Sequence, residues 1–128
     1  MASESSLSIG KHLRAALLAD QAVKAAVNDI YPLTGWNQEL PYIAYAVTGI
    51  EAGITKSIGP DCTLVEIAVY AETYDQACEI AETVRDALYK MEDPLMGPAR
   101  VINQKDAMPN DDTYMKILTI RILTSPLN

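Results

Sequence analysis

The chain has 128 residues, 49% of them hydrophobic, and a formal net charge of −7. This length suits a single domain with one hydrophobic core, which we expect to span residues 1–128. The acidic balance argues against a general nucleic-acid binder or a protein that binds anionic membranes, because both use basic residues to neutralise phosphates.

No hydrophobic run approaches the roughly 18 residues of a membrane-spanning helix, and the polar start MASESSLSIG does not resemble a signal peptide. Cys62 and Cys78 are too far apart for a CxxC motif and too few for a disulfide framework. We therefore expect a soluble, intracellular protein.

The first 27 residues predict either one bent helix or a helix followed by a short second one. In SLSIGKHLRAALLAD the apolar residues recur at helical spacing, with Ser6 or Ser8 as the candidate N-cap. Asp20 is a second candidate cap, since DQAVKAAV continues the helical period.

Two strands follow. IYPL is a short extended piece, because Pro32 lacks an N–H, and TGWNQELP is a loop. The residues of YIAYAVTGI alternate with a period of two, as in a strand. Turn residues follow in EAGITKSIGPD, and the next strand is CTLVEIAVYAE.

The clearest helix is TYDQACEIAETVRDALYKM, which has an apolar stripe and a capping box formed by Thr73 and Gln76. This helix ends at EDPLMGP. A weak strand running into a polar turn follows in ARVINQKDAMPNDD, and then a strong strand in TYMKILTIRILT. The order predicts an α+β domain: a mostly antiparallel four- to five-stranded sheet with two main helices packed on one face.

Both faces of the last strand are apolar. One face carries Leu118, Ile120 and Ile122. The other face carries Met115, Ile117 and Leu123. A sheet with helices on one side should leave one face polar. Either a loop of the same chain covers the second face, or that face meets another subunit.

Candidates for chemistry are few. His12 is the only histidine and is expected on a solvated helix face, whereas Cys78 sits beside an apolar stripe and is expected as a small core residue. We expect no catalytic residue, no metal site and no cofactor, since neither zinc or calcium spacing nor a glycine-rich phosphate loop is present. Trp36, in a polar loop, either closes the core or forms a binding contact.

Four segments, in their order and spacing, resemble one family of small phage proteins. They are LLADQAV at 17–23, IYP at 30–32, LPYIAY at 40–45 and VYAETYDQA at 69–77. Over residues 7–91 the chain is similar to the phage tail completion family, which includes siphophage tail terminators and tail-to-head joining proteins. Gln21 stands where a Pro is common in the family, and the TGWNQE loop is short.

The resemblance implies a structural virion protein of a phage or prophage and not an enzyme. It implies a hexameric ring that caps the head-proximal end of the tail tube and forms the docking platform for the head connector. The implied partners are further copies of the chain, the tail tube protein and the head-completion or connector protein, with no sequence-specific nucleic acid and no membrane. The implied location is the virion tail, with assembly in the host cytoplasm.

For subunit or partner contacts, we expect the 49–61 hairpin, the 103–112 turn and the outer face of the last strand. The candidate interface residues are Trp36, Ile54, Ile58, Met108, Leu118, Ile120 and Ile122.

Other interpretations stay open. One is a dimeric α+β module that binds a small ligand without catalysis, with Tyr42, Tyr45 and Trp36 lining its pocket. A head-side adaptor protein is another, and an enzyme that uses Cys78 and His12 is a third.

Overall fold

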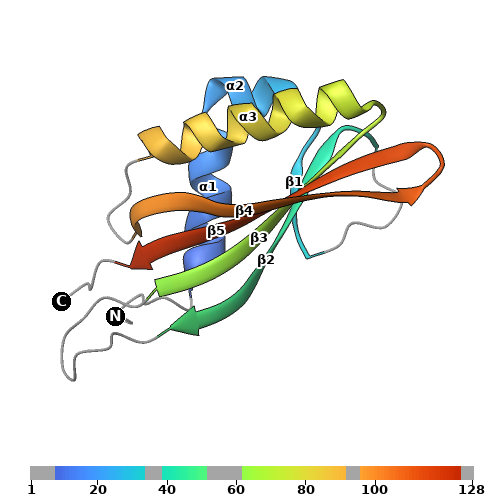
Figure 1. Cartoon of the computed structure of the whole chain (residues 1–128). Helices are drawn as coiled ribbons and strands as arrows, with labels where there is room; N and C mark the ends of the chain where they lie inside the picture. The colour runs from blue at the N-terminus through green and yellow to red at the C-terminus, as the bar shows by residue number, and fades with distance from the viewer. Residues whose placement is uncertain (1–7, 34–38, 52–61, 92–95, 125–128) are drawn as a thin grey trace.

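The computed structural model describes residues 8–33, 39–51, 62–91 and 96–124 (Figure 1). The helices in these ranges are α1 (Ile9–Ala19), α2 (Gln21–Ala26) and α3 (Tyr74–Lys90). The strands are β1 (Ile30–Pro32), β2 (Tyr42–Glu51), β3 (Cys62–Ala71), β4 (Met96–Asn110) and β5 (Thr113–Thr124).

The five strands form one sheet in the order β1-β2-β3-β5-β4. β1 pairs with β2 in parallel, with Ile30 opposite Ile43, and the other three pairings are antiparallel. All three helices lie on the same side of this sheet (Figure 1). The predicted α+β class with a mostly antiparallel sheet is therefore confirmed.

Side-chain caps explain where two of the helices begin. The Asp20 carboxylate accepts hydrogen bonds from the N–H groups of Ala22 and Val23 at 3.0 and 3.1 Å, so the chain forms two helices here and not one bent helix. Thr73 accepts from the N–H of Gln76 at 3.1 Å and so caps α3. Ser8 occupies the N-cap position of α1, but its side chain makes no capping hydrogen bond.

The core lies between the helices and one face of the sheet. Along β3 the alternate side chains from Thr63 to Ala71 are buried, as the period of two in a strand requires. They face apolar side chains of α1 and α3, among which Leu13, Leu17 and Val84 are almost completely buried.

β4 is much longer than the sequence indicated. We expected a turn over 103–112, but the strand continues to Asn110 and the turn occupies only Asp111 and Asp112. The strongly apolar β5 supplies a partner for this polar stretch, and pairing outweighs its weak strand propensity. β4 forms one edge of the sheet, and its register shifts at three places: Met96/Ala99, Val101/Asn103 and Ala107/Asn110.

The structure predicts unequal effects for two isoleucines on the same strand. Ile120→Ala should lower the free energy of unfolding by about 2–5 kcal/mol, because Ile120 is fully buried. Ile117→Ala, the matched control on the opposite face of β5, should cost no more than about 1 kcal/mol. Urea unfolding of dilute protein measures both. Equal losses would mean that the two faces of β5 are covered equally.

Candidate interaction surface

The two faces of β5 have different environments. Leu118, Ile120 and Ile122 point into the core and are at most 5% exposed. Our assignment of these three residues to the outer face was therefore wrong, because the strand's alternation turns them toward the helices. The outer face carries Met115, Ile117, Thr119, Arg121 and Leu123.

The other predicted contact residues fall in different places. Met108 is 53% exposed on β4, near the hairpin turn, and stays a candidate contact. Trp36, Ile54 and Ile58 lie outside the described residues. Of the 49–61 hairpin, residues 49–51 belong to β2 and the rest is also outside.

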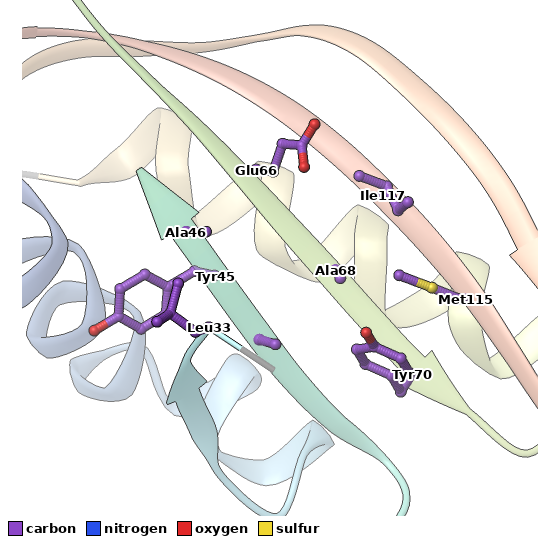
Figure 2. Close-up of a pocket in the computed structure, with 9 residues that line it drawn as sticks. Leu33, Tyr45, Ala46, Glu66, Ala68, Tyr70, Met115 and Ile117 are labelled. Atoms are coloured by element: carbon purple, nitrogen blue, oxygen red, sulfur yellow. The ribbon is translucent and has the colours of Figure 1, made fainter. Parts of the chain in front are cut away.

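The face of the sheet opposite the helices contains an apolar hollow of about 400 Å³ (Figure 2). Side chains from β2, β3 and β5 line it, together with Leu33, which follows β1. The lining residues are Leu33, Ala44, Tyr45, Ala46, Glu66, Ala68, Tyr70, Met115 and Ile117. Glu66 carries the only carboxylate among them.

Small side chains create this hollow. Ala44 lies directly opposite Ala68 in the β2–β3 pairing, and Ala46 lies opposite Glu66. Ala68 in turn faces Ile117 on β5, and the larger side chains around the alanines form the walls. The surface is hollowed at this place because the alanine side chains at its centre end at Cβ.

Leu33 forms the rim of the hollow next to β1. Its side chain is 67% exposed, and its backbone has φ of 62°. Positive φ is uncommon for a leucine, which gains no local hydrogen bond from its side chain. Its N–H donates to the carbonyl oxygen of Tyr45 at 2.6 Å, and this bond fixes the turn that holds an apolar side chain in solvent.

Three tyrosines extend the same surface beyond the hollow. The rings of Tyr42 and Tyr70 stack with centroids 4.5 Å apart, and Tyr31 meets Tyr42 edge to face at 5.9 Å. Burial raises the pKa of Tyr42 and of Tyr70 above the ordinary phenol value. The phenols of Tyr42 and Tyr70 therefore stay neutral at physiological pH.

A second cluster joins the β4–β5 hairpin to the start of α3. The Lys116 ammonium donates to Asp106 at 2.6 Å and to Gln104 at 2.8 Å. The Tyr74 hydroxyl donates to the same Asp106 carboxylate at 3.1 Å, and the Lys116 ammonium lies 5.5 Å from the Tyr74 ring centroid. The Lys116 side chain is only 12% exposed, so this cluster fixes the direction of the hairpin.

The cluster shifts the ionisation of its members. The hydrogen bond from Lys116 lowers the pKa of Asp106, and the same bond raises the pKa of Lys116. Hydrogen bonds to Cys78 and then to Asp106 raise the pKa of Tyr74. At neutral pH the cluster therefore contains one carboxylate, one ammonium and a neutral phenol.

The residues considered for chemistry are placed as follows. His12 is half-buried on α1, and Cys78 is half-buried on α3 beside Tyr74, where it lines a groove of about 300 Å³ between α3 and the hairpin. Among the described residues, no three His, Cys, Asp or Glu side chains are grouped to hold a metal ion. In the same residues, no helix has the length and apolar character needed to cross a membrane.

Part of this surface had a signal in the sequence. The alternation in YIAYAVTGI puts Tyr42, Ala44 and Ala46 on one face, and the hollow lies on that face. The hydrogen bonds of Asp106 with Lys116 and Tyr74 had no signal in the sequence. The three residues come from β4, β5 and α3 and meet only in the folded chain.

An open apolar hollow on one face of a sheet is typical of the class of proteins that bind other chains. The chain belongs to the family described as Tail completion protein gp17, which matches residues 11–125. It is therefore a structural protein of the phage tail, and the family match extends well past the 7–91 resemblance. No curated protein sequence is similar enough to count as a match.

Two solved structures share the fold. A chain from the virion of a native gene transfer agent particle superposes with a TM-score of 0.71 at 17% identity, covering 89% of this chain and 92% of its own length. The gp17 protein of bacteriophage SPP1 superposes with a TM-score of 0.62 at 19% identity, covering 96% of this chain and 92% of its own.

The cluster predicts that Lys116→Met will loosen the hairpin. Amides of residues 103–107 should exchange hydrogen several-fold faster, because Asp106 and Gln104 lose their donor, while amides of β3 keep their protection. Lys105→Met, on the opposite face of β4, is the control and should have no such effect. Equal effects from both variants would contradict the assigned role of Lys116.

Acid should release the same contact. Because the pKa of Asp106 is lowered in the folded protein, its stabilising contribution is complete above the ordinary carboxyl value of about 3.9 and is lost as the pH falls through the lowered pKa. The contribution of Lys116, whose pKa is raised, is lost only as the pH rises past about 10.4. NMR shifts of residues 104–106 should therefore change below about pH 4. A transition centred above that value would contradict the prediction.

Proposed function

We propose that this chain closes the head-proximal end of a phage tail tube as a hexameric ring and forms the platform on which the head connector docks. The observation that carries the proposal is the apolar sheet face outside the helices, in a chain of the tail completion family. An apolar surface of this kind is typically covered in the assembled state. The ring would cover it with other copies or with the tail tube protein.

A ring built from identical copies uses two different patches on each subunit, and the contact must close on itself. The helices lie on one side of the sheet and leave its other side open, so one subunit has two unlike sides for such a contact (Figure 1). Met108 is exposed near the end of the β4–β5 hairpin and would suit contact with a further protein, such as the tube or the connector.

The net charge of −7 fits a ring through which DNA passes, since like charge disfavours adhesion to phosphates. In this proposal the chain makes or breaks no bond and needs no cofactor. Its work is to stop growth of the tube and then to offer a surface, first in the host cytoplasm and then in the virion.

Light scattering over a concentration series tests the ring. Six copies of 14.0 kDa would weigh about 84 kDa, and a closed species of that mass is the expected result. A tight dimer that persists on dilution would contradict the ring and would favour the ligand-binding module.

Deletion of the gene from the phage or prophage that carries it tests the role. Tails should then be abnormal in length and unattached to heads, because tube growth is no longer stopped and no platform is present. Complementation with the intact gene is the control. Normal free tails alongside defective heads would instead indicate a head-side adaptor.

A further inference from the structure

Glu66 supplies the one carboxylate among the residues that line the hollow. Glu66 is exposed on the outer face of β3, between Ala46 on β2 and Thr119 on β5. Among the residues that the structure describes, no cation pairs with it. A carboxylate within an apolar surface favours a partner that brings both apolar area and one positive charge.

A group of that composition is present on α3. Tyr89 is 58% exposed, and the guanidinium of Arg85 lies 5.9 Å from the centroid of its ring. The Arg85 side chain is 46% exposed and also contacts Glu82 at 3.0 Å. Tyrosine and arginine are enriched in the centres of protein interfaces, and a guanidinium has donors for two carboxylates.

We propose that the hollow receives α3 of a second copy of this chain, with Tyr89 seated among the alanines and Arg85 paired to Glu66. The proposal rests on the proposed ring and specifies its subunit contact. The hollow opens on the helix-free face of the sheet, whereas Arg85 and Tyr89 belong to a helix on the other side (Figures 1 and 2). One copy therefore cannot satisfy its own contact, and the contact passes from copy to copy, as closure of a ring requires.

Complementarity supports this occupant. The hollow of about 400 Å³ has room for a tyrosine ring and a guanidinium, and its walls are apolar except at Glu66. A two-fold dimer through the same hollow would instead bring the two Glu66 carboxylates toward each other, and like charges repel. The head-to-tail contact pairs opposite charges at every interface.

Charge reversal tests the pairing. Glu66→Arg and Arg85→Glu should each weaken self-association of the full chain by about tenfold or more, because each places like charges in contact. Glu79→Arg and Lys24→Glu, which reverse exposed charges elsewhere on α3 and on α2, are matched controls and should change it little. Circular dichroism and thermal unfolding confirm that all four variants fold. Unchanged association in both test variants would overturn the proposal.

A mixture of the two variants gives the more specific result. In an alternating ring, the arginine introduced at position 66 of one variant meets the glutamate introduced at position 85 of the other. At the next interface the native Glu66 meets the native Arg85, so every contact is restored. An equimolar mixture should therefore recover a species of wild-type mass in sedimentation velocity, and so should the double variant. Failure of both to recover, with each single variant folded, would overturn the pairing.

Failure of this contact can be told apart from failure of the tail role. Wild-type protein that stays monomeric up to about 1 mM overturns the contact, since copies held this way associate without any other chain. The effect of gene deletion on tails is independent of that result. If tails need the protein but Glu66→Arg and Arg85→Glu both support normal tails, the role stands and this contact is wrong.

Discussion

The placement of all three helices on one face of the sheet is the constraint on which the rest of the structure depends. A strand alternates its side chains, so every buried residue of β3 and β5 has a neighbour on the other face. The first set, which faces the helices, is buried by them. The second set, on the opposite face of the sheet, is left to other interactions. Ala68 and Ile117, which are apolar members of the second set, lie outside the core cluster.

Local signals predicted most of the fold. The caps at Asp20 and Thr73 and the alternation of β2, β3 and β5 depend on neighbours in the chain, and each element formed where these signals occur. The extent of β4 did not follow from its own residues, because its pairing with β5 decides it. Sequence patterns predict elements well where the stabilising contacts are local and less well where a distant strand supplies them.

The interaction surface was harder to predict for the same reason. Alternation shows that β5 has two apolar faces, but it does not show which face the helices cover. Our choice of Leu118, Ile120 and Ile122 was wrong because both faces looked equally suitable. The hollow needs three strands in register to bring Ala44, Ala68 and Ile117 side by side, and that register exists only in the folded sheet.

The three register shifts of β4 have a consequence for the protein before it meets its partners. A fifteen-residue edge strand with a regular row of free N–H and C=O groups would invite other strands to add to it without limit. Bulges interrupt that row, and Pro109 removes a donor from it. This edge is therefore a poor template for the addition of a further strand.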